Sequence, residues 1–276
     1  MLCGNDFIRA ALEEDLGFAD ITSEAIIPPA HRSQASLIAK EQGILAGAGW
    51  FSDFFRFLDP DLEIHWFKKD SQEIQRGETV ATLHGRTRAL LGAERSALNL
   101  LQNLCGIATF TQKAVACLEN SPIRVLDTRK TLPLLRQFQK YAVKAGGGTN
   151  HRFGLFDMFL IKENHIRSAG SLSEAILLCR AFAHHKKIEV ETTNLSEVKE
   201  AVAAAPDIIM LDNMNDKEIL EAALYIRDKS SILIEASGNM TLERLRGLRN
   251  HPLDFISMGS LIHSAKALDL SFLITN

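Results

Sequence analysis

The chain of 276 residues is 46% hydrophobic and 24% charged, the balance of a globular protein with room for two domains. Its formal net charge of -3 gives no general attraction to nucleic acid, and no apolar stretch approaches the roughly 18 uncharged residues that a membrane helix needs. Acidic residues in 1–15 argue against a signal peptide, so we expect a cytoplasmic protein whose four cysteines, which lack zinc-site spacing, are reduced and mostly in the core: Cys3, Cys105, Cys117 and Cys179.

Residues 1–105 predict an N-terminal α+β domain. A short helix is expected at the start, strand-like segments lie around 36–39 and 79–83, and an aromatic-rich helix is expected at 50–58. A longer helical pattern at about 90–118 joins this domain to a second one at 106–276.

From about residue 157 onward, short apolar runs alternate with amphipathic helical patterns. Such runs are typical of strands buried on both faces, and several helical patterns open with a Ser, Asp or Thr that can cap the first turn. Regular alternation predicts a parallel sheet, either a barrel or doubly wound. The expected strands are 158–161, 188–190, 208–211, 232–234 and 255–258, and the expected helices are 173–183, 196–205, 216–227 and 241–248.

Polar residues at the ends of these expected strands decide between the two architectures. Side chains from many strand ends converge on one point only in a barrel. We therefore predict a TIM-like α/β barrel with one or two strands fewer than eight, whose C-terminal end can pack back on the first domain. The strand-end residues are Lys162, Glu191, Asp212, Glu235 and Gly259.

The segment 124–152 is strongly basic, with seven Lys or Arg residues and only one acid. An ordinary solvated surface is one interpretation of such a run. The charges here interrupt a strand end and a glycine triplet, which permits close approach of a ligand to the backbone. Arg129 and Arg152, together with His151, supply the donors that carboxylates or phosphates require, so the segment predicts an anion site.

Other strand-end residues each have more than one interpretation. Glu191 and Asp212 offer oxygen ligands for Mg²⁺, with capping of the next helix as the alternative. Lys162 is an ordinary lysine, an anion ligand, or the Schiff-base lysine of an aldolase-like barrel. The turns at 237–239 and 259–260 follow the last two strands, where TIM barrels commonly bind phosphate through backbone amides.

An ordered set of motifs over nearly the whole chain resembles the quinolinate phosphoribosyltransferase family. Each motif alone is weak, whereas the ordered set is highly specific. The motifs are EDLG at 14–17, DIT at 20–22, ERSALN at 94–99, DTRKT at 127–131, KYAV at 140–143, GGG at 146–148, NHR at 150–152, IKENH at 161–165, EASG at 235–238 and SMG at 257–259.

The resemblance implies an enzyme of NAD biosynthesis that transfers the phosphoribosyl group of phosphoribosyl pyrophosphate to quinolinate with decarboxylation, giving nicotinate mononucleotide, pyrophosphate and carbon dioxide. It implies Mg²⁺ at Glu191 and Asp212, directly or through water. It also implies a homodimer in which the N-terminal domain completes the partner's site and Arg95 is donated across the interface. The residues implied to bind quinolinate are Arg95, Arg129, His151, Arg152 and Lys162. Those implied to bind phosphoribosyl pyrophosphate are Lys130, Glu191, Asp212, Ser237, Gly238, Gly259 and His263. The implied catalytic residues are Lys130, Lys162, Glu191 and Asp212.

Four positions depart from the family pattern. Leu132 and Leu134 stand where Thr and Gly are frequent, Gln139 where Glu is frequent, and Asn239 where Gly is usual. If that glycine has a positive φ, Asn is among the least costly substitutes, so we expect an intact phosphate loop. Residues 162–165 are enzyme-like and differ from the molybdenum-transport accessory proteins that share the fold.

Two other functions stay open on the residues alone. One is a Schiff-base enzyme that uses Lys162, and the other is a nucleic-acid- or anion-binding protein that uses 124–152. The acids Glu191 and Asp212 argue against the second, since they repel a polyanion unless a metal intervenes. We expect small-molecule substrates, no nucleic acid and no membrane span.

Overall fold

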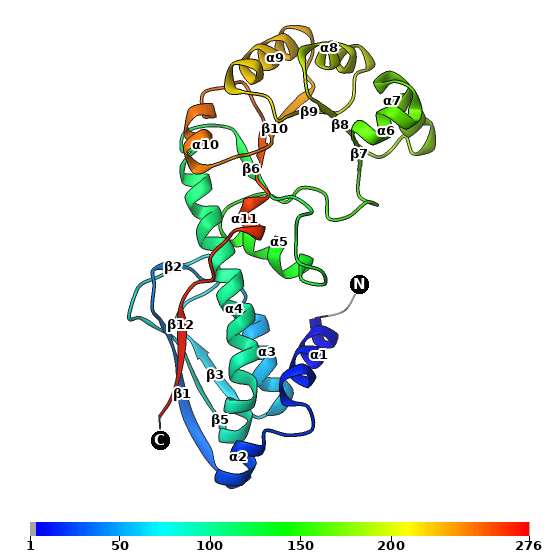
Figure 1. Ribbon diagram of the computed structural model, residues 1–276. Coiled ribbons are helices and arrows are strands. Elements are labelled where there is room, and N and C mark those ends of the chain that lie inside the picture. Colours follow the sequence, from blue (N-terminus) through cyan, green and yellow to red (C-terminus); the bar gives the residue numbers. More distant parts are fainter. Residues whose placement is uncertain (1–3, 276) are drawn as a thin grey trace. The chain divides into compact units, whose positions relative to one another are not determined.

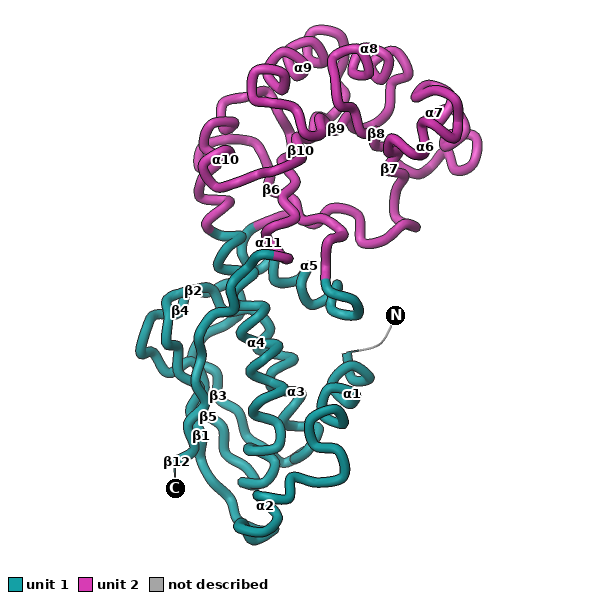
Figure 2. Tube along the Cα trace, in the orientation of Figure 1, with its two compact units in different colours: residues 1–112, 132–147, 264–276 teal, residues 113–131, 148–263 magenta. Residues whose placement is uncertain are grey.

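The structure is a computed structural model that describes residues 4–275, so Cys3 lies outside the described residues. The chain forms two compact units, each built from more than one stretch of sequence (Figure 2). Unit 1 comprises Met1–Gln112, Leu132–Gly147 and Ser264–Asn276, and unit 2 comprises Lys113–Thr131 and Gly148–His263. The C-terminal segment thus belongs to unit 1, while the division at 105/106 into two domains stays a prediction.

Unit 1 is an α+β structure built on a four-stranded sheet of order β12-β1-β5-β3 (Figure 1). All three strand pairs are antiparallel, and the register of β1 with β12 joins the first strand of the chain to the last. Its elements are α1 (Gly4–Leu16), α2 (Ile21–Ile26), β1 (Arg32–Ala39), β2 (Gly43–Ile44), α3 (Ala48–Leu58), β3 (Glu63–Trp66), β4 (Glu73–Ile74), β5 (Thr79–Arg86), most of α4 (Thr87–Ala116), α5 (Arg136–Ala145) and β12 (Leu270–Thr275).

The core of unit 1 is aromatic. Helix α3 buries Phe51, Phe54 and Phe55, and the ring of Phe55 stacks on Phe272 of β12 with centroids 5.3 Å apart. Buried aromatic side chains supply large apolar area, so this packing holds the helix on the sheet. The expected aromatic helix at 50–58 is confirmed, and it begins two residues earlier than expected.

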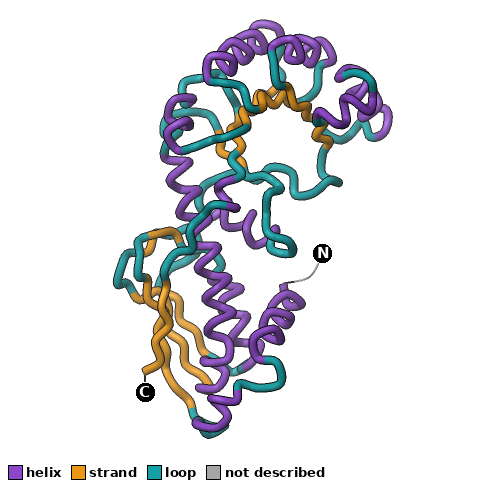
Figure 3. Tube along the Cα trace, in the orientation of Figure 1, coloured by secondary structure: helices purple, strands orange, loops and turns teal. Residues whose placement is uncertain are grey.

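Unit 2 contains six parallel strands in the order β6-β11-β10-β9-β8-β7, with the helices outside them (Figure 3). This sheet confirms the prediction of a barrel-like α/β unit with fewer than eight strands. Its elements are β6 (Arg124–Leu126), β7 (Phe159–Ile161), α6 (Glu163–Ala169), α7 (Leu172–Phe182), β8 (Ile188–Thr192), α8 (Leu195–Ala204), β9 (Ile208–Asp212), α9 (Asp216–Lys229), β10 (Leu233–Ser237), α10 (Leu242–Leu248), β11 (Phe255–Ser257) and α11 (Ser260–His263).

Short polar side chains start the helices of unit 2. The side chains of Ser171, Asn194, Asn215 and Thr241 each accept a hydrogen bond from a backbone N–H in the first turn of α7, α8, α9 and α10. These bonds satisfy donors that the helix itself leaves unpaired. The expected helices are therefore confirmed, with starts displaced by one residue at three of the four.

The strand ends are only partly where the sequence placed them. Lys162 follows β7 directly and Asp212 ends β9, as expected. Glu191 is the fourth residue of β8 and Glu235 the third of β10, so the placement of Glu235 after its strand was wrong. Strand β10 continues because its pairing with β9 runs on to Ser237 opposite Asp212.

The described cysteines are free, as expected, with Cys105 and Cys117 buried and Cys179 partly exposed. Burial raises the pKa of the Cys105 thiol to about 12, so it stays protonated and inert. Within residues 4–275, no helix is long and apolar enough to cross a membrane.

Candidate active site

A cavity of about 720 Å³ opens at the carboxyl ends of the strands of unit 2. Parallel strands present their carboxyl ends at one edge, so this is where α/β barrels place their sites. The cavity brings together all but one of the site residues predicted from sequence: Arg129, Lys130, His151, Arg152, Lys162, Glu191, Asp212, Ser237, Gly238, Gly259 and His263. The exception is Arg95, which is exposed on α4 in unit 1.

Two arginines form a basic wall of the cavity. The Nε atoms of Arg129 and Arg152 are buried and make no hydrogen bond to the described residues, while Nη1 of Arg152 donates to the Met158 carbonyl at 3.2 Å. Burial lowers the pKa of Arg152, and the positive charge of Arg129 lowers it further. The charges of Glu189 and Asp157 offset part of the cost of burying Arg152, and the Nε donors of the two arginines, unpaired within the described residues, suit an anionic ligand.

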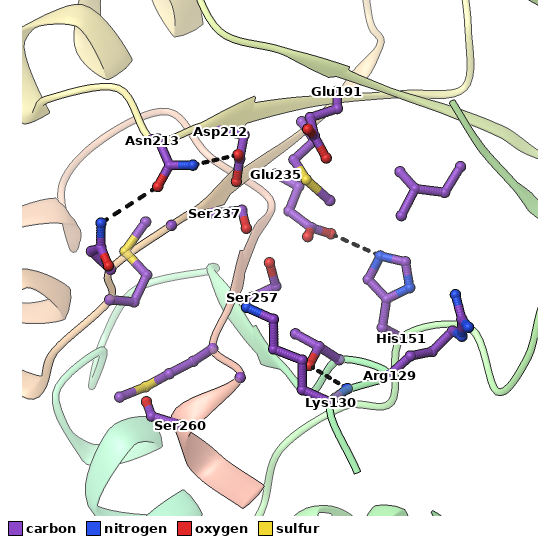
Figure 4. Close-up of a pocket in the computed structure, with 18 of the residues that line it drawn as sticks. Arg129, Lys130, His151, Glu191, Asp212, Asn213, Glu235, Ser237, Ser257 and Ser260 are labelled. Atoms are coloured by element: carbon purple, nitrogen blue, oxygen red, sulfur yellow. Dashed lines mark hydrogen bonds and ion pairs between the residues drawn. The ribbon is translucent and has the colours of Figure 1, made fainter. Parts of the chain in front are cut away.

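Asp127 fixes the segment that carries His151. Its fully buried carboxylate accepts a hydrogen bond from the His151 backbone N–H at 2.9 Å and another from the Asn150 side chain at 2.6 Å. The ring Nδ1 of His151 accepts from the Arg152 backbone N–H at 2.7 Å, which places the ring proton on Nε2. That nitrogen lies 3.0 Å from Glu189 and 3.6 Å from Glu235, and Figure 4 shows Glu235 facing the ring.

Glu189 and Glu235 form a buried acid pair behind His151. Both are wholly inaccessible to solvent, and their carboxylate oxygens lie with the histidine nitrogen within 4.8 Å of one another. Desolvation raises the pKa of Glu235 well above its ordinary value, and the charge of Glu189 raises it further. A proton on Glu235 relieves the repulsion between the two acids and leaves one negative charge opposite the histidine and arginines.

The opposite side of the cavity is acidic at its rim. Lys162 forms an ion pair with Glu191. Asp212 Oδ2 accepts a hydrogen bond from the Asn213 side chain at 2.6 Å, and Figure 4 draws this bond as a dashed line. His165 is used structurally, because its Nδ1 accepts from the Lys162 backbone N–H at 2.9 Å at the start of α6. The salt bridge uses Lys162 as a cation, which does not suit a Schiff-base nucleophile.

The turn after β10 confirms the reasoning about Asn239. Gly238 has φ +94 and Asn239 has φ +48, so both residues adopt the left-handed conformations in which Gly and Asn are least strained. A Cβ atom at Gly238 would lie 2.8 Å from the backbone nitrogen of Asn213. Glycine is therefore required at 238, whereas asparagine is accommodated at 239.

The turn after β11 gathers the remaining basic residues. A Cβ atom at Gly259 would lie 3.0 Å from Lys130 Cδ and 3.3 Å from His263 Nε2, so both side chains pack over this glycine. Ser260 begins the short helix α11 beside it. Lys130, His263 and the backbone of this turn thus offer cationic and N–H donors to one ligand group.

Two other departures from the family pattern lie just before α5 and within it. Leu134 has φ +65 and an exposed side chain, so a glycine here is less strained than the leucine present. Gln139 accepts a hydrogen bond from the Leu132 backbone N–H at 2.9 Å and donates one to Asn103 at 3.3 Å. An ionised glutamate at this position has no N–H and so does not donate the second bond.

Several residues of the site were missed from sequence. Glu189 gave a usable signal, because it is a charged residue between the buried apolar residues Ile188 and Val190 of the same strand. Asn213, which bonds to Asp212, gave only a weak one as a polar residue following a strand end. Ser257 lines the cavity from inside β11; it belongs to the SMG motif at 257–259, but no role was assigned to it.

Comparisons with known proteins agree along the whole chain. Residues 20–105 match the family model of the quinolinate phosphoribosyl transferase N-terminal domain, and residues 107–273 match that of the C-terminal domain. The chain is 44% identical over 263 residues to a Bacillus subtilis protein named probable nicotinate-nucleotide pyrophosphorylase (carboxylating), covering 95% of this chain and 90% of the relative. It is 40% identical over 286 residues to quinolinate phosphoribosyltransferase (decarboxylating) 1b of Nicotiana tabacum, covering 97% and 81%.

Solved structures give the same answer. The crystal structure of NadC from Streptococcus pyogenes superposes with a TM-score of 0.93 at 42% identity, covering 99% of this chain and 97% of that one. The nicotinate-nucleotide pyrophosphorylase of Francisella tularensis superposes with a TM-score of 0.94 at 38% identity, covering 100% and 98%. With both family models matched and relatives aligned over nearly their full length, the chain belongs to the quinolinate phosphoribosyl transferase family.

Proposed function

We propose that this protein transfers the phosphoribosyl group of phosphoribosyl pyrophosphate to quinolinate and decarboxylates the product, giving nicotinate mononucleotide, pyrophosphate and carbon dioxide in NAD biosynthesis. The observation that carries the proposal is the pair Arg129 and Arg152, whose buried Nε atoms have no hydrogen-bond partner among the described residues. Quinolinate is a planar dicarboxylate, and two guanidinium groups with His151 and Lys162 match its charge and hydrogen-bonding capacity.

The donor substrate fits the opposite part of the same cavity. Glu191 and Asp212 are suited to ribose hydroxyls or to Mg²⁺, and Lys130, His263 and the turns at Ser237, Gly238 and Gly259 are suited to phosphates. Two carboxylates match the oxygen preference of Mg²⁺, which keeps several water ligands. Because Glu191 is paired with Lys162 and Asp212 with Asn213, contact through water fits both acids.

The mechanism is one of positioning and charge neutralisation. The quinolinate nitrogen donates its electron pair to the anomeric carbon as the bond from that carbon to pyrophosphate breaks. When bound, Mg²⁺ supplies positive charge that stabilises the departing pyrophosphate. Lys130 and the turn at Gly259 hold phosphate oxygens, while Arg129, His151 and Arg152 hold the pyridine ring in place.

Decarboxylation follows from the new positive charge on the ring nitrogen. The bond from the adjacent ring carbon to its carboxylate breaks, carbon dioxide leaves, and the electron pair stays on the ring carbon next to the cationic nitrogen. That carbon then takes up a proton to give nicotinate mononucleotide. Lys162 offers a cation beside these events, and no covalent bond to the protein is needed.

The active enzyme is proposed to be a cytoplasmic homodimer. In this arrangement the N-terminal α+β domain of one protomer forms a lid and dimer contacts, and Arg95 binds quinolinate in the site of its partner. The exposed position of Arg95 on α4 is compatible with that role. No role in binding nucleic acid is proposed, since Glu191, Asp212 and Glu189 surround the basic wall with negative charge.

The test is chromatographic detection of nicotinate mononucleotide after incubation with quinolinate, phosphoribosyl pyrophosphate and Mg²⁺, with nicotinate as a parallel substrate. Product from quinolinate alone supports the proposal. Product from nicotinate alone overturns the substrate, and product from neither overturns the function. Arg152→Gln is a negative variant, since its amide carries no charge and is too short to replace the guanidinium group that donates to the Met158 carbonyl.

A further inference from the structure

Arg244 in α10 binds two loops of the site at once while lying outside the cavity lining. Its Nη1 donates to the Gly238 carbonyl at 2.6 Å, its Nη2 donates to the Met214 carbonyl at 2.5 Å, and its Nε donates to Asp216 at 2.9 Å. The side chain is 19% exposed. One guanidinium group therefore joins the turn after β10 to the loop after β9.

These two loops carry the residues proposed to bind the donor substrate. The loop after β9 follows Asp212 and begins with Asn213, and the turn after β10 contains Gly238 and Asn239. All three loop residues have positive φ, at +57, +94 and +48 in chain order. For the two asparagines, though not for the glycine, this conformation costs some free energy, which surrounding contacts must offset.

Two hydrogen bonds also join the loops directly. The Asn213 backbone N–H donates to the Ser237 carbonyl at 3.1 Å, and the Asn239 side chain reaches Asn213 Oδ1 at 3.5 Å. The hydrogen bonds from Arg244 are shorter and come from a charged donor, which makes them the stronger ties.

We propose that Arg244 is a positioning residue that sets the separation of these two loops, so that Asp212 and the Gly238 turn engage the same phosphoribosyl pyrophosphate molecule. The inference rests on the proposed function and adds to it a residue that touches neither substrate. The planar fork of arginine reaches three acceptors in fixed directions, which lysine cannot do. Its effect is expected on the donor substrate, because the quinolinate ligands Arg129, His151 and Arg152 belong to other segments.

The kinetic test compares Arg244→Ala and Arg244→Lys with Arg246→Ala, which removes an exposed arginine from the same helix. We expect the KM for phosphoribosyl pyrophosphate to rise about tenfold or more in Arg244→Ala and less in Arg244→Lys, with the KM for quinolinate within about twofold of wild type. Added guanidinium ion at millimolar concentration restores part of the loss in Arg244→Ala. Equal rises in both KM values, or an unchanged KM for phosphoribosyl pyrophosphate, overturn the proposal.

Hydrogen exchange measured by mass spectrometry separates this inference from the proposed function. Loss of protection in the loops at 213–216 and 237–241 in Arg244→Ala, with protection retained in Arg246→Ala, supports Arg244 as a positioning residue even if the wild-type protein makes no nicotinate mononucleotide. Unchanged protection in both loops overturns it. Absence of turnover by wild type with loop protection lost in Arg244→Ala overturns the proposed function alone.

Discussion

Replacing Gly238 with alanine separates backbone strain from steric collision in the phosphate turn. At φ +94 an alanine costs about 1–3 kcal/mol in backbone strain, whatever atoms surround it. At this position the new Cβ would also lie 2.3 Å from Asn213 Oδ1 and 2.8 Å from its backbone nitrogen. Asn213 must then move, and it is the residue that donates to Asp212.

The collision is expected to add about 1–3 kcal/mol to the strain, as overpacking does elsewhere. Since about 1.4 kcal/mol corresponds to a factor of ten in affinity, the KM for phosphoribosyl pyrophosphate should rise by roughly 5- to 150-fold. Steady-state kinetics at saturating quinolinate measure this rise, and thermal unfolding measures the loss of stability in parallel.

Gly170 provides the matched control in the same unit. Its φ is +95, and a Cβ atom there would meet no atom within 4 Å, so Gly170→Ala has the strain without the collision. We expect it to lower the unfolding temperature and leave the KM for phosphoribosyl pyrophosphate unchanged. A similar KM in Gly238→Ala and wild type, or an equal rise in both variants, refutes the reasoning.

Three other predictions follow from the site. Arg129→Ala and Arg152→Ala should each weaken quinolinate binding by about 3–5 kcal/mol, because a buried carboxylate then lacks its charged donor, and unchanged affinity by calorimetry in both variants contradicts the pocket assignment. Glu235→Gln should gain stability over wild type as pH rises. The raised pKa of Glu235 means that wild type loses stability as the pH climbs from the ordinary value of 4.5 toward the raised one, by about 1.4 kcal/mol per pH unit, whereas the amide does not titrate. A difference in unfolding temperature that stays constant from pH 5 to about pH 8 argues against the buried acid pair. Mixing inactive Arg95→Ala and Lys162→Ala protomers should restore part of the activity in heterodimers, and absence of rescue argues against a shared site.

Much of the fold was predictable because its signals are local. Alternating apolar runs and capped helical patterns identified the parallel strands of unit 2, since a strand buried on both faces needs a continuous apolar run. Asn239 has the positive φ on which the expectation of a tolerated asparagine was conditional, and such a turn conformation depends mainly on the residue and its neighbours. The motif around Arg129 and the one around Lys162 also led to the cavity.

Other features arise only from contacts between distant segments. Glu235 was misplaced because the length of β10 depends on its pairing with β9, which its own residues do not reveal. The raised pKa of Glu235 depends on its own desolvation and on the charge of Glu189, which lies on another strand. Arg244 looks like any helix arginine in sequence, and its role is visible only through its bonds to the Gly238 and Met214 carbonyls.

The sequence by itself determined the fold class, the family motifs and most of the residues that line the cavity. Tertiary structure alone decided how the stretches of the chain are divided between the two units. It also decided which acidic residues are buried together and which side chains form hydrogen bonds between loops. The physical reason is range: helix capping, turn conformation and apolar periodicity act between residues a few positions apart. Desolvation, shared protons and hydrogen bonds between loops depend on which distant segments meet in space, and only folding brings those segments together.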